Sequence, residues 1–199
     1  MKSLLHAGSG EKTYREIPVS FEPDEWKETR LDLDPELKPD VVGDITNMPQ
    51  IATESFDAVF TSHTVEHLYP QEVHKAFDEF IRVLNSDGFV LIACPDLQAI
   101  ASLVAEGKLL EEIYMSPEGP VTPLDMLYGF RKAIAEGKTY MTHKTGFTLP
   151  VLLYSLKSVG FKSVIGKRRI QDFELWAFAS KKELSEAELT FAEQRYFPK

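Results

Sequence analysis

Short apolar runs, each followed by glycine or an acidic residue, recur through the first half of the chain. Leu4-Leu5 comes just before Gly8-Ser9-Gly10, and residues 29–34 alternate polar and apolar before ending in an acid. Residues 39–45 form another short run, and residues 55–62 are almost continuously apolar, as a central parallel strand should be. These patterns predict four strands, each ending where the backbone turns.

A helix is predicted over residues 73–84, because apolar side chains recur there at helical spacing and form one stripe. The stripe consists of Val73, Ala76, Phe77, Phe80, Ile81 and Leu84. Residues 85–88 are expected to stop this helix, and residues 89–94 read as the next buried strand. Strand, helix and strand therefore alternate through residue 94, which indicates a doubly wound, mostly parallel α/β sheet of about seven strands.

The alternation is interrupted over residues 97–147. Helices are expected to begin after Asp96 and at Thr122-Pro123, with a turn-rich loop over residues 115–120. An insertion at the carboxyl edge of a sheet is often a lid or a substrate wall, and the alternative is a structural or dimer-forming appendage. We expect one domain over residues 1–199, with the lid-like helical insertion inside it.

The last part of the chain returns to the regular pattern. Residues 148–159 carry a helical apolar stripe that ends at Gly160. Residues 163–166 and 175–179 read as two strands, and the short link between them favours an antiparallel pair. The sheet is therefore expected to end with an antiparallel last strand.

Composition narrows the choice of partners. Of the 199 residues, 43% are hydrophobic and 27% charged, with a net charge of −9. That balance argues against a nucleic acid or an anionic membrane as the main partner. Cys94 is the only cysteine and no apolar run approaches a membrane span, so a reducing, cytoplasmic location is expected. Assembly into a homodimer is left open.

The loop after the first strand is the leading candidate for ligand binding. Glycines at positions 8 and 10 permit positive φ and close approach of a ligand. Asp32 follows Gly10 by 22 residues, where a parallel nucleotide-binding sheet places an acid that accepts from ribose hydroxyls. Asp44 is placed to accept from an exocyclic amine such as that of adenine. The alternative is that Asp32 belongs to a solvated turn and Asp44 caps the turn over residues 46–49.

Taken in order, these segments resemble the class I S-adenosylmethionine-dependent methyltransferases of the small-molecule type (type 11-like). The resemblance covers most of residues 3–96 and 143–180. It rests on His6-Ala7-Gly8-Ser9-Gly10, Asp32, Asp44-Ile45, Val65-Glu66-His67-Leu68, the turn Arg82-Val83-Leu84-Asn85-Ser86-Asp87-Gly88-Phe89, and Gly160-Phe161. It implies a Rossmann-like methyltransferase fold, S-adenosyl-L-methionine as cofactor and methyl transfer (EC 2.1.1 class) to a small-molecule acceptor.

The resemblance also implies the residues that bind the cofactor. They are the loop His6, Ala7, Gly8, Ser9 and Gly10, the pair Asp32 and Leu33, the pair Asp44 and Ile45, and Ser62 with His63 after the fourth strand. His6 replaces the acid that the family usually has, and Lys12 replaces a third glycine. A non-catalytic domain that binds S-adenosyl ligands, as a sensor or scaffold, therefore remains an alternative. A nicotinamide-dependent oxidoreductase fits less well, because a complete G-x-G-x-x-G is absent.

Catalytic roles are assigned to histidines, because only histidine has an unperturbed pKa near neutrality. His143 and His67 are the candidates for a general base, and His63 is a further one. Tyr114, Tyr128 and Asp125 are placed to line an acceptor pocket in the insertion. No metal site is predicted.

Overall fold

The centre of the molecule is a seven-stranded sheet with the strand order β3-β2-β1-β4-β5-β9-β8. The computed structural model describes residues 1–11, 18, 20–116 and 119–198, so Lys12 and most of the first crossover lie outside the described residues. The strands of the sheet are β1 (Lys2–Ala7), β2 (Trp26–Asp32), β3 (Val41–Val42), β4 (Phe56–Ser62), β5 (Leu84–Pro95), β8 (Ser163–Arg169) and β9 (Glu174–Ser180).

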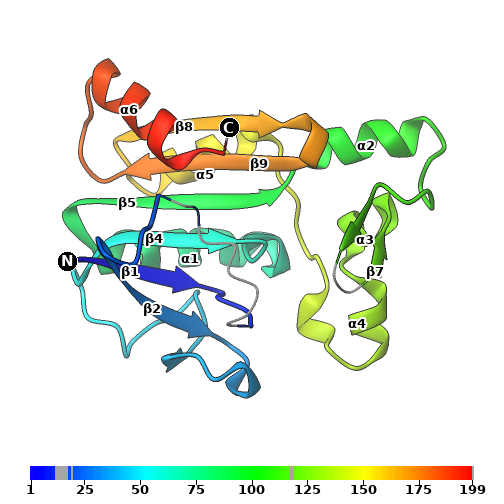
Figure 1. Ribbon diagram of the computed structural model, residues 1–199, viewed down its shortest axis with the longest axis horizontal. Helices are drawn as coiled ribbons and strands as arrows, with labels where there is room; N and C mark the ends of the chain where they lie inside the picture. The colour runs from blue at the N-terminus through cyan, green and yellow to red at the C-terminus, as the bar shows by residue number, and fades with distance from the viewer. Residues whose placement is uncertain (12–17, 19, 117–118, 199) are drawn as a thin grey trace.

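The predicted fold class is confirmed. Strands β1 to β5 run parallel to one another, and β9 pairs antiparallel with both β5 and β8. Parallel strands need both faces covered, and the near-continuous apolar residues of β4 and β5 reflect that burial. Their carboxyl ends all lie at one edge of the sheet (Figure 1).

Helices cover both faces of this sheet. Helices α1 (Pro70–Val83) and α5 (Leu149–Ser158) pack on one face, and α6 (Glu186–Tyr196) covers the other (Figure 1). The stripe predicted over residues 73–84 is the buried side of α1. Pro70 begins this helix, and the Glu72 carboxylate accepts from the backbone N–H of Tyr69 at 2.9 Å.

The insertion forms a separate small layer beyond the carboxyl ends of the parallel strands (Figure 1). It contains α2 (Leu97–Ala105), the hairpin β6 (Tyr114–Ser116) and β7 (Gly119–Val121), α3 (Pro123–Tyr128) and α4 (Arg131–Ala135). Ile100, Val121 and Met126 form its own buried cluster. Asp96 caps α2 as expected, accepting from the backbone N–H groups of Gln98 and Ala99. Short 3-10 turns complete the fold: η1 (Pro35–Leu37), η2 (Val65–His67), η3 (Thr139–Met141) and η4 (Ile170–Asp172).

The structure adds detail to three local predictions. Helix α1 ends at Val83, so it stops before residues 85–88 as predicted, but these residues belong to β5, which begins at Leu84, and not to a separate turn. Within the turn-rich segment expected over residues 115–120, the described residues lie in paired strands, Met115 and Ser116 in β6 and Gly119 and Pro120 in β7. The helix expected to begin at Thr122-Pro123 does begin there, but it ends at Tyr128, because Gly129 has a φ of +94° and its missing Cβ would overlap the carbonyl oxygen of Met141. None of the described helices is long and apolar enough to cross a membrane.

Candidate functional site

The candidate site forms where the loops after β1, β2 and β4 meet at the carboxyl edge of the sheet. Gly8 has a φ of +72°, and a Cβ there would lie 2.3 Å from Thr64 Oγ1. Only glycine therefore allows the loop after β1 to lie against the loop after β4. Gly10 also has positive φ, +58°, and apart from its chain neighbours no atom of the described residues lies within 4 Å of the position its Cβ would take.

Asp32 ties the glycine loop to the end of β2. Its Oδ2 accepts from the backbone N–H of Gly10 at 2.9 Å, and its Oδ1 accepts from that of Asp34 at 3.0 Å. The carboxylate is only half-buried, and each oxygen keeps a lone pair for a further donor. This geometry suits recognition of a pair of ribose hydroxyls.

The Arg30 side chain holds the glycine loop through hydrogen bonds, a role that the sequence did not indicate. The side chain is buried, and its Nη2 donates to the carbonyl oxygen of Gly10 at 2.5 Å. Its Nη1 donates to the carbonyl oxygen of Lys38 at 3.3 Å. The residues next to Arg30 in the sequence could not have indicated this role, because both of its hydrogen-bond partners are backbone carbonyl oxygens that other loops bring to it.

The other residues assigned to cofactor binding lie in different environments. Ala7 and Ser9 are buried within the loop, and the Ser9 hydroxyl has no hydrogen-bond partner among the described residues. His6 is directed away from the edge, since its Nδ1 lies 2.9 Å from Glu28 Oε1 and its ring packs against Phe60. The structure therefore brings the loop backbone, but not the His6 side chain, into the site.

Asp44 and its neighbours line the next part of the edge. Asp44 is exposed, and its Oδ1 accepts from both the backbone N–H and the hydroxyl of Thr46 at 2.8 Å, so it does cap the following turn. Its Oδ2 makes neither contact. Leu33 is exposed and Ile45 is buried. Ser62 is half-buried, and its carbonyl oxygen accepts from Thr64 Oγ1 at 3.0 Å.

His63 lies between two carboxylates at the end of β4. Its Nδ1 is 3.5 Å from Glu66 Oε1 and its Nε2 is 3.4 Å from Glu174 Oε1, and its backbone has a φ of +48°. Burial disfavours the imidazolium, but hydrogen bonding to Glu174 and electrostatic attraction to both Glu174 and Glu66 outweigh it and raise the pKa of His63 to about 10. The same contacts hold the pKa of Glu174 at about 2, against its burial. Sequence reasoning missed Glu174, which β9 supplies.

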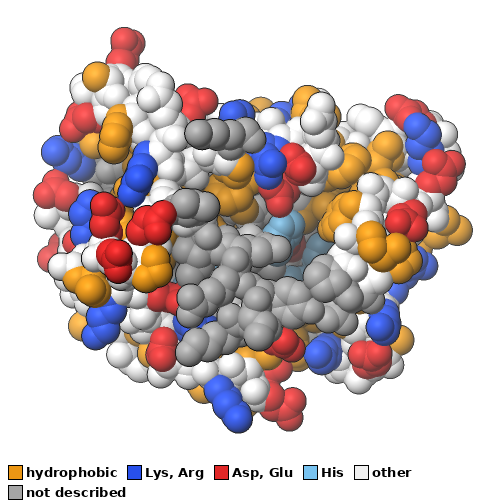
Figure 2. Space-filling model, in the orientation of Figure 1, with side chains coloured by type: hydrophobic (Ala, Val, Ile, Leu, Met, Phe, Trp, Pro, Cys, Tyr) orange, Lys and Arg blue, Asp and Glu red, His pale blue; other side chains and the backbone are white. Residues whose placement is uncertain are grey.

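A cavity of about 200 Å³ opens between the sheet edge and the insertion. Leu97, Ile100, Met126 and Leu127 supply apolar walls, and Glu66, Tyr128 and His143 supply polar groups. Figure 2 shows histidine side chains at the bottom of a hollow that is bordered by hydrophobic side chains. Tyr128 and His143 thus line the cavity.

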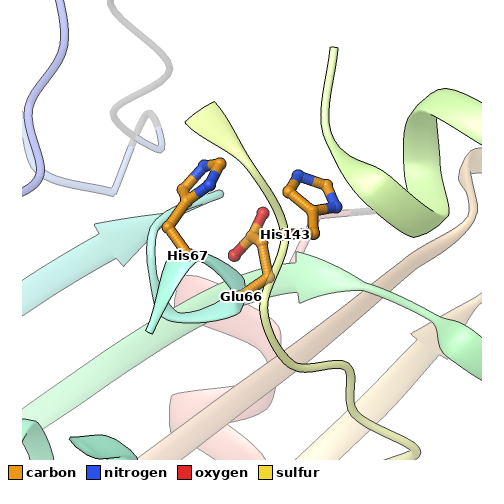
Figure 3. A group of neighbouring side chains, drawn as sticks. All are labelled: Glu66, His67 and His143. Carbon is orange, nitrogen blue, oxygen red and sulfur yellow. The ribbon is translucent and has the colours of Figure 1, made fainter. Parts of the chain in front are cut away.

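His67 and His143 are held by backbone carbonyls. His67 Nδ1 lies 3.2 Å from the carbonyl oxygen of Thr142, and His143 Nδ1 lies 2.8 Å from that of Met126. A carbonyl oxygen only accepts, so each Nδ1 carries the proton, and in the neutral ring Nε2 is left as an acceptor. Burial lowers the pKa of His143. Figure 3 shows the Glu66 carboxylate between the two rings.

The insertion is fastened to the sheet at several points. The carbonyl oxygen of Glu66 accepts from the backbone N–H groups of Lys144 at 2.8 Å and Thr145 at 3.1 Å. The hydroxyl of Tyr140 donates to Asp34 Oδ2 at 2.9 Å, next to the Asp32 loop. The insertion therefore contacts both the end of β2 and the loop after β4.

Asp125, expected to face the cleft, instead braces the insertion internally. Its Oδ2 accepts from the Thr122 hydroxyl at 2.6 Å, and its Oδ1 accepts from Arg131 Nε at 2.7 Å. These bonds join the start of α3 to the start of α4 across Gly129. The expectation failed because a residue three positions after a helix-capping threonine is well placed for a capping box.

Tyr114 is exposed, and its hydroxyl lies 3.5 Å from Met126 Sδ.

Comparisons with known proteins agree with this architecture. Residues 5–92 match the family model described as a methyltransferase domain. No curated protein sequence matches the chain. Among solved structures, the CMeT domain of the citrinin polyketide synthase superposes with a TM-score of 0.60 at 17% identity, over 92% of this chain and 47% of that one. The chain thus spans about half of that structure's length.

Two bacterial structures are similar over most of their own length. A SAM-dependent methyltransferase from Thermotoga maritima gives a TM-score of 0.56 at 14% identity, covering 92% of this chain and 83% of that one. The 1,6-didemethyltoxoflavin-N1-methyltransferase of Burkholderia thailandensis, solved with 1,6-didemethyltoxoflavin and S-adenosylhomocysteine, gives 0.57 at 15% identity, covering 92% and 72%. At these identities the likeness shows the fold.

The Asp125 brace predicts a pH-dependent contribution to stability. Although burial opposes the charged form, hydrogen bonds from Arg131 and Thr122 lower the pKa of Asp125 to about 2. The stabilisation is therefore complete above the ordinary aspartate value of 3.8 and is lost as the pH falls toward 2. Thermal denaturation should show Asp125→Asn melting below wild type at pH 6, with the difference shrinking below pH 4. A difference that grows as the pH falls would contradict the assignment.

Proposed function

We propose that this chain, whose residues 5–92 belong to the methyltransferase domain family, transfers a methyl group from S-adenosylmethionine to a small molecule held in the cavity beside Glu66 and His143. The observation that carries this proposal is the adjacency of two subsites. Thr64 contacts Gly8 of the glycine loop, and Glu66, two residues further along, lines the cavity.

The residues at the sheet edge fit the cofactor. The positive-φ backbone at Gly10, the Ser9 hydroxyl, which has no hydrogen-bond partner among the described residues, and the half-buried Asp32 carboxylate would form a polar cradle for a nucleoside. When bound, S-adenosylmethionine supplies a methyl group already activated on a sulfonium, so the protein need only align the partners and exclude water. Asp32 would hold the ribose, and the loop from Gly8 to Gly10 would border the amino-acid portion.

The cavity supports an acceptor of modest size. Its volume of about 200 Å³ and its apolar walls suit a small, partly apolar molecule. The neutral His143 ring, with Nε2 as acceptor, is placed to take a proton from a hydroxyl or amine or to orient it. The insertion, fastened through Tyr140 to Asp34, would keep water from both subsites. The Burkholderia thailandensis enzyme, which holds a small heterocycle together with S-adenosylhomocysteine, supports this class of acceptor.

Ligand binding is the first test of the function. S-adenosylhomocysteine should raise the melting temperature in a saturable manner, whereas NAD at the same concentration should leave it unchanged, since binding to the folded state alone stabilises by mass action. A shift with NAD and none with S-adenosylhomocysteine would replace the proposal with a nicotinamide-dependent oxidoreductase. Binding without any methyl transfer across a broad acceptor panel would favour a non-catalytic sensor.

Asp32 and Asp34 provide a matched pair for locating the ribose. Charge-assisted hydrogen bonds to two hydroxyls contribute roughly 1.5–3 kcal/mol, so Asp32→Ala should weaken S-adenosylhomocysteine about ten- to a hundredfold in titration calorimetry. Asp34→Ala should weaken it much less, because that carboxylate is engaged by Glu36 N–H and Tyr140. Circular dichroism controls for folding. The reverse ranking would place the ribose at Asp34.

Replacement of His143 should separate binding from turnover. His143→Ala should change S-adenosylhomocysteine affinity by less than about threefold, because the nucleoside cradle is built from other loops. Turnover with an acceptor found in the panel should fall by about 10²–10⁴, the usual contribution of a positioned proton acceptor. The exposed His74 offers a control, and His74→Ala should retain wild-type turnover. Equal activity in both variants would remove His143 from the acceptor site.

A further inference from the structure

The side chains of Glu66, His67 and His143 gather beside the cavity, which Glu66 and His143 line. One donor atom from each residue lies within 4.8 Å of the others, and Figure 3 shows the carboxylate between the two imidazoles. We propose that these three side chains bind a divalent transition-metal ion. The loop after β4 supplies Glu66 and His67, and the insertion supplies His143.

The buried state of Glu66 is the first argument. The residue is 1% exposed, and neither carboxylate oxygen has a hydrogen-bond partner in the described part of the chain. His63 is a partial counter-charge: its Nδ1 lies 3.5 Å from Glu66 Oε1, which is too long for a good hydrogen bond, and the same ring is shared with Glu174 at 3.4 Å. A carboxylate taken out of water is costly unless it is paired or coordinates a metal. A cation between Glu66 and the two rings would satisfy it.

The orientation of the histidines is the second argument. Metal-ligating histidines usually donate their other ring N–H to a backbone carbonyl or a carboxylate, which fixes the tautomer and the ring direction. His67 and His143 both show this arrangement, through the carbonyl oxygens of Thr142 and Met126. Each ring is therefore fixed with Nε2 available as a lone-pair donor. The contact between His67 and Thr142 joins two segments that lie 75 residues apart in the sequence.

The donor set selects the class of metal. Imidazole suits Zn²⁺, Fe²⁺, Cu²⁺ and Ni²⁺, whereas Mg²⁺ and Ca²⁺ prefer oxygen ligands. Two histidines and one glutamate form the protein ligand set of several zinc sites and leave one or more positions open. Ligand atoms of a tetrahedral zinc ion lie roughly 3.3–3.5 Å apart, so modest side-chain rotations would close the present spacing. We therefore assign the site to zinc-like ions.

The open position would face the cavity, because Glu66 and His143 both line it. This part of the inference rests on the proposed function: an acceptor oxygen or nitrogen bound there would be fixed and made more acidic next to the cofactor subsite. With the ion bound, the Nε2 lone pair of His143 would be used as a ligand, so His143 would act on the acceptor through the metal in place of taking the proton itself. Metal binding itself does not depend on that function. It can be measured without a methyl donor or an acceptor.

The test is calorimetric titration of the full, tag-free chain with Zn²⁺ and separately with Mg²⁺. We expect one saturable Zn²⁺ site, no comparable Mg²⁺ site, and a higher melting temperature with Zn²⁺. Co²⁺ should give visible absorption bands of a four- or five-coordinate ion. His67→Ala, His143→Ala and Glu66→Gln should each lower the affinity for Zn²⁺ by more than about tenfold, whereas His74→Ala should not. Mutation of the groups that orient a metal ligand already costs about 10–100-fold in metal affinity, and removal of the ligand itself should cost at least as much.

Two outcomes would overturn the proposal: no Zn²⁺ uptake by wild type, or equal Zn²⁺ affinity in wild type and the three ligand variants. Titration with S-adenosylhomocysteine separates this result from the proposed function. Variants that lose Zn²⁺ but still bind S-adenosylhomocysteine support both proposals. A wild-type chain that binds Zn²⁺ through these residues but binds no S-adenosyl ligand retains the metal site and refutes the methyltransferase.

Discussion

The candidate site depends on how the buried carboxylate of Glu66 is compensated by the groups around it. Its side chain lies beside His63 and near the two other histidines, while its backbone carbonyl accepts from Lys144 and Thr145. One residue therefore connects the end of β4, the insertion and the cavity. An anion in this position is stable only with compensating groups around it. The histidines gathered at this point supply that compensation, either directly or by sharing a cation.

The parallel sheet explains why chemistry collects at this edge. Parallel strands direct all their following loops to one side, so the glycine loop, Asp32 and the Glu66 turn meet there. The β-sheet core is apolar on both faces, and several residues with positive φ lie at this edge. Gly8 and Gly10 have positive φ, and so does His63, which is not a glycine. A rigid sheet can hold such conformations, and loops placed on it can carry function.

The insertion adds what the sheet lacks. It brings His143 and Tyr128 to one side of the cavity and reaches Asp34 through Tyr140. Within the insertion, a small apolar cluster and the Asp125–Arg131 brace add internal contacts to those that fasten it to the sheet.

Local pattern in the sequence determined most of the fold. The period-3.6 stripe of α1, the apolar runs of β4 and β5, the capping Asp96 and the spacing from Gly10 to Asp32 are short-range signals, and the structure confirms the elements and the fold class they predicted. Tertiary structure alone decided which side chains meet. The pairing of His63 with Glu174 across 111 residues, the support of Gly10 by Arg30, and the internal role of Asp125 could not be predicted. Periodicity records which face of an element is buried, whereas these contacts depend on how distant loops fold against one another.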